Sequence, residues 1–200
     1  QIFVAKKHLY SDTKNFFITA DAGSGARISS VNMSSLPENK NVSTYNDYDF
    51  IEENKVNLSL SGKIFLGDEF GAVTDKSYEF NFPNLIPSQP VKLNISVATN
   101  AIHAGAGSNF TIATDGGGNT NNIYLSGVGE PYNGIFNTAT YANRIINLIG
   151  INSAFNVNLN FNRNGDFNTK GWLDYLQVNA ISNLQYNGQP LYFRNVSSVG

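Results

Sequence analysis

The sequence contains no cysteine among its 200 residues. Disulfide bonds, zinc–thiolate sites and a cysteine nucleophile are therefore excluded within this chain. Histidine is almost as scarce, with only His8 and His103. Each lies without nearby catalytic partners in the sequence, and there is no G-x-S-x-G nucleophile elbow. We therefore interpret both histidines as surface or packing residues and expect no catalytic constellation in this chain.

Charge is also scarce. Charged residues make up 14% of the chain, the net charge is −2, and lysine and arginine form no cluster. A basic stripe is the electrostatic signature of nucleic-acid binding, so a nucleic-acid partner is not expected. No apolar run approaches the length that spans a bilayer. The sequence begins at Gln1 without a basic and then apolar signal segment, so we expect either a removed signal or an internal fragment.

What is present favours a folded β protein. Hydrophobic residues make up 41% and aromatic residues 12%, which is enough to build a core. Asparagine is abundant, with 30 copies. Asparagine is disfavoured inside helices and central strands and common in turns. This composition indicates many short strands joined by polar loops.

Alternation of apolar and polar residues predicts where the strands lie. It is clearest over 91–98 and 155–162, where each segment has one dry face and one wet face. Asn187-Gly188 predicts a hairpin turn between 184–186 and 191–193. The segment 141–149 fits either a short helix or a strand. Further strands are expected at 16–19, 27–31, 78–82, 110–113, 123–126 and 172–178, and 47–60 is expected to be a strand or an extended linker.

These elements predict an all-β fold. From about residue 47 onward the pattern indicates one β-sandwich of roughly eight to ten strands, of the jelly-roll type. A change in composition near 39–46 suggests that residues 1–45 form a small N-terminal β segment. That segment either belongs to the same domain or precedes it, and 46–200 forms the sandwich.

Two loops resemble ligand-binding motifs. Residues 23–28 resemble the start of a dinucleotide fingerprint, but Ile28 replaces the third glycine and no helix follows, so a hairpin loop is favoured. Asn162, Asn164 and Asp166 surround a glycine, as in an oxygen-rich calcium loop. The glycine and glutamate positions of an EF-hand do not match. A polar turn is favoured, and calcium is the one cofactor these residues leave open.

Paired carboxylates and exposed aromatic residues are candidates for an enzyme site and a glycan site. Asp68-Glu69 and Glu52-Glu53 are adjacent pairs, and neighbours on a strand point to opposite faces, so solvated charges are favoured over a glycosidase pair. Aromatic rings stack on sugars, so a glycan platform remains an alternative. The candidate rings are Tyr124, Tyr132, Tyr141 and Trp172.

Three stretches within 45–200 together resemble one family. Residues 61–70 read S-G-K-I-F-L-G-D-E-F and are similar to an S-G-R-x-W-x-G-E-x-F stretch of that family. Residues 78–85 followed by 90–93 form the second stretch. The most specific is 171–180, G-W-L-D-Y-L-Q-V-N-A, which runs into 184 and 191–194. Their order and spacing are similar to the region before the peptidase domain in the PorU family.

The PorU family comprises gingipain-like (C25) cysteine peptidases that act as sortases of the type IX secretion system in Bacteroidota. This sequence departs from the family at Lys63, where arginine is expected, and at Phe65, where tryptophan is expected. The resemblance implies a larger protein that cleaves C-terminal secretion signals from cargo and joins cargo to an anchoring lipopolysaccharide. Its catalysis uses a cysteine with a histidine partner, and neither can be placed on this sequence.

The chain is accordingly expected to be the non-catalytic N-terminal portion of such a sortase, with the peptidase domain following Gly200. Its expected partners are that C25-like domain and cargo C-terminal signal domains or other secretion components. The expected location is extracytoplasmic, at the outer membrane, at the cell surface or in the periplasm of a Gram-negative bacterium. The alternative is a carbohydrate-binding jelly-roll module of a secreted bacterial protein. A free-standing hydrolase would have to depend on His8 or His103.

Overall fold

A computed structural model describes residues 30, 41–60, 62–102, 107–115, 120–129, 138–186, 188 and 191–196. The chain divides into two compact units, of which one comprises Lys6–Asn41 and the other contains Val42–Gly200. Only the described residues from Val42 onward are considered below. The expected strand at 16–19, the loop at 23–28, His8, His103 and Tyr132 lie outside the described residues, as does the strand at 27–31 apart from Ser30. The expected division at residue 45 stays a prediction.

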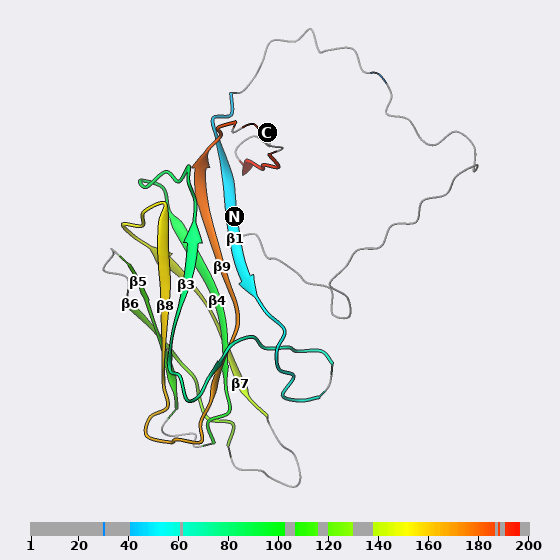
Figure 1. The fold of residues 1–200 in the computed structure, drawn as a ribbon, viewed down its shortest axis with the longest axis vertical. Coiled ribbons are helices and arrows are strands. Elements are labelled where there is room, and N and C mark those ends of the chain that lie inside the picture. The colour runs from blue at the N-terminus through cyan, green and yellow to red at the C-terminus, as the bar shows by residue number, and fades with distance from the viewer. Residues whose placement is uncertain are drawn as a thin grey trace, which may run out of the picture. The chain divides into compact units, whose positions relative to one another are not determined.

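The described residues from Val42 onward form two antiparallel sheets (Figure 1). In the first sheet the strand order is β1-β9-β4-β7, with β2 also paired to β9. In the second sheet the order is β3-β8-β5-β6. The strands are β1 (Thr44–Glu52), β2 (Glu69–Phe70), β3 (Asp75–Asn81), β4 (Val91–Thr99), β5 (Asn109–Thr114), β6 (Thr120–Tyr124), β7 (Thr140–Leu148), β8 (Ala154–Asn162) and β9 (Gly171–Asn183).

The pairing of these strands is nested. β5 pairs with β6, β4 with β7, β3 with β8 and β1 with β9, all antiparallel. Early strands therefore pair with late ones, as in a long hairpin that has been rolled into two sheets. This is the jelly-roll order. The expected all-β sandwich of jelly-roll type is confirmed, and the described residues contain no α-helix.

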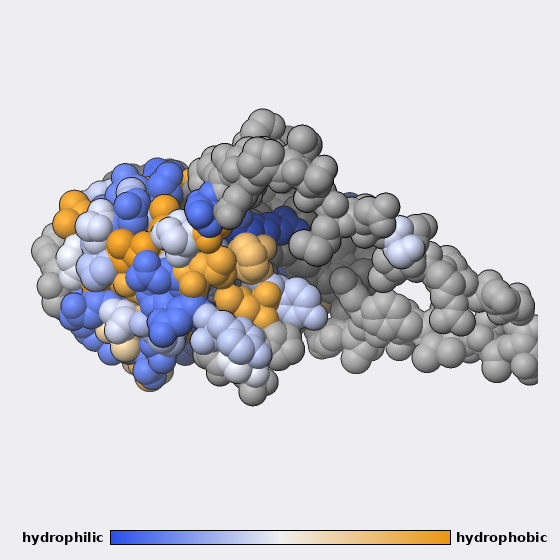
Figure 2. Space-filling view, turned by 90° about the horizontal axis from the view of Figure 1, so that it is seen from above, coloured by the Kyte–Doolittle hydropathy of each residue, from blue (hydrophilic) through white to orange (hydrophobic). Residues whose placement is uncertain are grey.

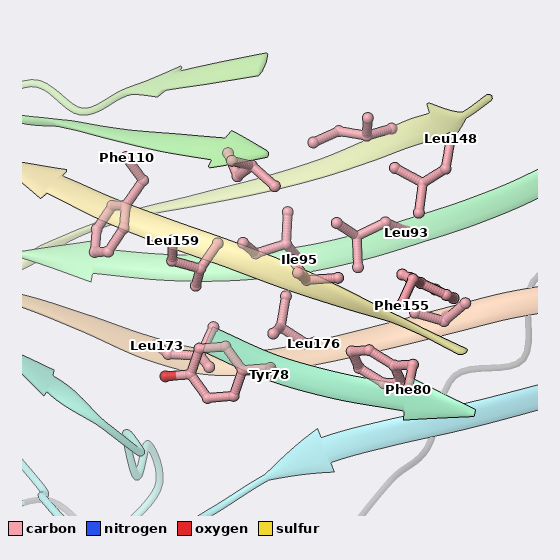
Figure 3. Packing of buried hydrophobic residues seen from close by; sticks show 14 of the residues in the cluster. Tyr78, Phe80, Leu93, Ile95, Phe110, Leu148, Phe155, Leu159, Leu173 and Leu176 are labelled. Carbon is pink, nitrogen blue, oxygen red and sulfur yellow. The ribbon is translucent and has the colours of Figure 1, made fainter. Parts of the chain in front are cut away.

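The core lies between the two sheets (Figure 3). Leu93 and Ile95 point inward from β4, and Phe155 and Leu159 point inward from β8. These are the apolar positions of the alternating segments, while the intervening residues face outward. On β4 most of these outward residues are also buried, so the wet face expected for 91–98 is wrong. Aromatic rings fill one end of the core: Phe110 lies 5.1 Å from Phe70 and 4.7 Å from Phe161, measured between ring centroids. The hydrophobic pattern thus places each strand with its dry face against the opposite sheet.

Several local expectations are refined. The segment 141–149 forms no helix, and all but its last residue belongs to strand β7. Of the strand expected at 123–126 only 123–124 belong to a strand, β6, and of 47–60 only 47–52 do, in β1. β9 runs past 178 to Asn183. Among the described residues, no helix is long and apolar enough to cross a membrane.

The expected C-terminal hairpin is wrong in its flanks. Neither 184–186 nor 191–193 is a strand, and Asn187 lies outside the described residues. Both segments instead bond to the start of β1: the Leu184 N–H donates to Ser43 O at 2.8 Å and the Asn46 N–H donates to Arg194 O at 2.7 Å. The Asn-Gly turn signal is local, so it could not show that these two segments form hydrogen bonds with β1 and not with each other.

Candidate functional site

The first and third stretches that resemble the PorU family lie side by side. Glu69 is paired with Trp172 and Phe70 with Gly171 in the ladder between β2 and β9. The Gly67 N–H donates to Leu173 O at 2.7 Å. The second stretch contacts the first because the Tyr78 hydroxyl donates a hydrogen bond to Asp68. It contacts β9 through an isolated β-bridge between Leu85 and Ser182. The three stretches therefore form one structural unit and not three separate sites.

Trp172 is part of the packing of this unit. Its side chain is only 2% exposed and contacts Leu66 and Ala98. A ring that stacks on a sugar must be accessible, so Trp172 cannot serve as a glycan platform. The expectation for Trp172 is corrected because Leu58 and Leu66, from the segment before β2, and Ala139 pack with it, and these residues are distant from Trp172 in the sequence.

Asp68 joins this unit to β3. Its carboxylate accepts hydrogen bonds from Lys55 Nζ at 2.7 Å and from the Tyr78 hydroxyl at 2.8 Å, and Lys76 Nζ lies 3.3 Å away. Burial raises the pKa of Asp68, but the hydrogen bonds from Lys55 and Tyr78 outweigh it, so the net pKa is lowered. The pKa of Tyr78 is raised by burial and by its bond to Asp68. Asp68 is therefore a half-buried clamp and not a solvated charge.

The neighbouring carboxylate has a different partner. Glu69 Oε1 lies 2.8 Å from Lys170 Nζ, on the loop before β9. Asp68 and Glu69 thus hold separate cations, as expected for adjacent residues of an extended segment. They do not form a facing pair that could act on a glycosidic bond.

Replacing Asp68 with asparagine is expected to lower the free energy of unfolding by about 1–3 kcal/mol at neutral pH, because the two lysines lose their shared anion. The folded pKa of Asp68 is lowered, so its contribution is present above the unfolded pKa of about 3.9 and is lost as the pH falls through the folded pKa. The difference between wild type and D68N should shrink below about pH 4. Urea unfolding across pH measures it.

Glu79→Gln on the exposed side of β3 is the matched control, with an expected change within about 0.5 kcal/mol. A D68N difference that stayed constant down to the acid limit would contradict the clamp.

The calcium candidates fold the turn between β8 and β9. Asn162 Oδ1 accepts the Asn164 N–H at 2.9 Å, and the Asp166 carboxylate accepts the Asn168 N–H at 2.9 Å and the Thr169 hydroxyl at 2.8 Å. Asn164 adopts a positive φ of 53°, which asparagine tolerates in such turns. Among the described residues, no three histidine, aspartate or glutamate side chains gather as a metal site. Calcium binding by this turn stays a prediction.

The outer face of the β3-β8-β5-β6 sheet carries a concentrated polar surface. Asparagine occupies every second position along β8, from 156 to 162, opposite the buried apolar residues. The strands on either side place small side chains next to it. We call this surface the asparagine face and define it by Ser77, Thr111, Ala113, Asn156, Asn158, Asn160 and Asn162.

The small side chains leave the asparagine face hollowed. One hollow of about 390 Å³ is lined by Ser77, Thr111, Ala113 and Asn158 among others. A second, of about 370 Å³, lies toward the β8–β9 turn and is lined by residues that include Thr111, Asn160 and Phe167. Thr111 and Asn160 line both hollows, so the two lie next to each other. Volumes of this size suit a small ligand or part of a chain.

Two carboxylates hold the amides of the asparagine face in place. Asp115 accepts from Asn156 Nδ2 at 2.6 Å and from Asn158 Nδ2 at 2.8 Å, and Asp75 accepts from Asn160 Nδ2 at 2.7 Å. These hydrogen bonds lower the pKa of both carboxyl groups. Because the amide nitrogens of Asn156, Asn158 and Asn160 are each bound by a carboxylate, the orientation of these three amides is fixed and their oxygens are turned away from that contact.

Two exposed aromatic rings border the asparagine face. Tyr124, one of the rings singled out from the sequence, ends β6 and is 72% exposed. Phe167 in the β8–β9 turn is 88% exposed and lines the second hollow. Tyr141 lies on β7 of the other sheet, so it does not belong to this surface. The alternation within β8 pointed to a wet face, but its neighbours on β3 and β5 could not be found without the pairing.

The sandwich resembles part of PorU. The crystal structure of dimeric latent PorU from Porphyromonas gingivalis matches with a TM-score of 0.62 and 18% identity over 79% of this chain. The match covers only 14% of the PorU chain. The carbohydrate-binding module CBM36 in complex with calcium and xylotriose matches with a TM-score of 0.39 and 14% identity, over 66% of this chain and 98% of that one. No protein-family model and no curated protein matches the sequence.

Proposed function

We propose that this chain is the non-catalytic β-sandwich of a type IX secretion sortase of the PorU type. In this role it supports a C25-like cysteine peptidase domain elsewhere in the same protein, or recognises the C-terminal signals of cargo. The protein would act at the outer membrane, at the cell surface or in the periplasm of a Gram-negative bacterium. The chain itself, which has no cysteine, would contribute no cysteine nucleophile.

The observation that carries the proposal is the agreement between fold and sequence. The sandwich shares its fold with a part of PorU over 79% of its length. Independently, the stretches at 61–70 and 171–180, which resemble that family, pack against each other as β2 and β9. A resemblance by chance would not be expected to fall on segments that form one unit. The alternative, a carbohydrate-binding module, has the same kind of fold, so the fold alone does not separate the two.

A hydrophobic surface near the end of the sandwich where β9 ends suits contact with a further domain. Seen from that end, hydrophobic residues gather between hydrophilic ones (Figure 2). Leu191 is 38% exposed and Phe193 is 49% exposed, in the segment that bonds to the start of β1. Two exposed apolar side chains on one segment offer a contact to another protein surface. We propose that this segment packs on the peptidase domain.

The test uses the natural protein in a bacterium that encodes it. An antibody against this chain is expected to detect a species well above the mass of 200 residues that reacts with a cysteine-directed peptidase probe. In that protein, Leu191→Asp with Phe193→Asp is expected to slow removal of cargo C-terminal signals about tenfold or more, because charges desolvated at an apolar contact are costly. Mass spectrometry of secreted cargo measures the unprocessed fraction.

Ile145→Asp is the matched control, since Ile145 is 55% exposed on β7. It should leave cargo processing unchanged. If the natural full-length protein has no thiol-dependent peptidase activity, the sortase proposal is excluded. If Ile145→Asp and the Leu191→Asp, Phe193→Asp variant slow processing equally, only the proposed docking of the segment 191–193 is excluded.

A further inference from the structure

We infer that the asparagine face binds a neutral carbohydrate chain along β8. This goes beyond the proposed sortase role and does not depend on it. The reasoning starts from the chemistry of sugars, which present hydroxyl groups at their edges and apolar C–H groups on their faces. A site for them needs fixed groups that both accept and donate hydrogen bonds, together with accessible aromatic rings. The asparagine face has both.

The hydrogen-bonding groups are held in advance. Asn156 and Asn158 are oriented by Asp115, and Asn160 is oriented by Asp75. Next to them, the Thr111 hydroxyl donates to Asn122 Oδ1 at 2.8 Å. Side chains fixed by such partners lose little conformational freedom when a ligand binds. The face therefore offers a row of ordered amide and hydroxyl groups beside two adjoining hollows.

The aromatic rings lie at one end of this row. Tyr124 is paired in the ladder with Asn109, which is paired with Asn162. Neighbouring strands are about 4.8 Å apart, so the backbone of Tyr124 lies about 10 Å from that of Asn162 across β5. Phe167 follows Asn162 in the β8–β9 turn, and both residues line the second hollow. A sugar chain that follows β8 would meet amides along its length and rings near the β8–β9 turn.

The charge of the surface disfavours an anionic ligand. Asp75, Asp115 and the exposed Glu79 place three carboxylates on or beside it. The ammonium group of Lys76 is directed to Asp68, at 3.3 Å, and Arg163 Nη1 donates to Phe167 O at 3.2 Å. A polyanion such as a nucleic acid or an acidic polysaccharide would be repelled by these carboxylates. An apolar peptide would bury the amides without partners.

The test is a microarray of neutral and acidic oligosaccharides, followed by isothermal titration of this chain with the best neutral ligand. Asn158→Ala together with Asn160→Ala is expected to weaken binding about tenfold to thirtyfold, because two amide contacts are lost. Ser77→Ile, which fills the first hollow with a branched aliphatic side chain that favours strands and offers no aromatic ring, is expected to weaken it about tenfold or more. Affinity should change little with salt, since no ion pair is involved.

The matched control is Asn147→Ala, an exposed asparagine on β7 of the other sheet, which should bind as wild type does. Thermal unfolding of every variant verifies that it is folded. Absence of binding to all neutral oligosaccharides, preference for acidic ones, or equal affinity of wild type and the double asparagine variant would each overturn the inference.

Discussion

Replacing Phe110 with alanine is expected to lower the free energy of unfolding by about 3–5 kcal/mol. Phe110 is 0% exposed and its ring packs between Phe70 and Phe161, with an edge-to-face contact to Phe70. Removing the ring forfeits its burial and leaves a cavity that these rigid neighbours cannot fill. Domains are stable by only about 5–15 kcal/mol, so the loss would be a large share of the total.

Urea unfolding followed by tryptophan fluorescence measures this effect directly. The chain has one tryptophan, Trp172, which is buried at the start of β9, next to Gly171. Phe167→Ala is the matched control, since Phe167 is 88% exposed and its loss should change stability by no more than about 0.5 kcal/mol. Similar losses for the two variants would mean that the aromatic cluster at Phe110 does not hold the sheets together.

Gly171→Ala is expected to lower the free energy of unfolding by about 1–3 kcal/mol. Alanine ordinarily stabilises a strand relative to glycine, but a Cβ at Gly171 would lie 2.7 Å from Phe110 Cζ and 2.8 Å from the Phe161 ring. Both rings are buried in the core and cannot withdraw without disturbing the packing. The close approach therefore reverses the usual sign. Urea unfolding of G171A provides the measurement.

A double-mutant cycle with Phe110→Leu identifies the cause. Leucine lacks the Cζ atom that the new methyl group would meet first. G171A should therefore cost less in the F110L background than in the wild type, with a coupling energy of about 0.5–3 kcal/mol. Strictly additive effects would show that the cost of G171A does not come from this contact. The glycine of the most specific family-like stretch would then need another explanation.

Gly171 and Trp172, the first two residues of the stretch at 171–180, each have a specific packing role. Gly171 lets the Phe110 and Phe161 rings approach the backbone of β9, and Trp172 on the opposite side of the strand is covered by Leu66. Phe70 and Asp68 bring the first stretch against it. The stretches at 61–70 and 171–180 thus consist largely of residues that build the sandwich.

The sequence by itself determined the fold class and most strands. Period-two alternation is local, so 91–98 and 155–162 could be assigned as strands, and the face that each turns to the core could be read from the same pattern. The burial of the other face of 91–98 could not be read from it. The missing thiol likewise follows from composition alone. The segment 141–149 fits both a helix and a strand. Tyr141, Ile145 and Leu148 would share one face of a helix, whereas Ala142, Ile146 and Leu148 share one face of a strand.

Only the tertiary structure decided which strands are neighbours. The nested pairing joins β1 to β9 and β3 to β8, and such contacts between distant segments leave no mark on local periodicity. For that reason the sequence could not show that Trp172 is covered, that Asp68 is a clamp, or that Ser77 and Thr111 flank the asparagines of β8. Side chains become a site only when the strands that carry them are brought into register, and register is set by packing across the whole sandwich.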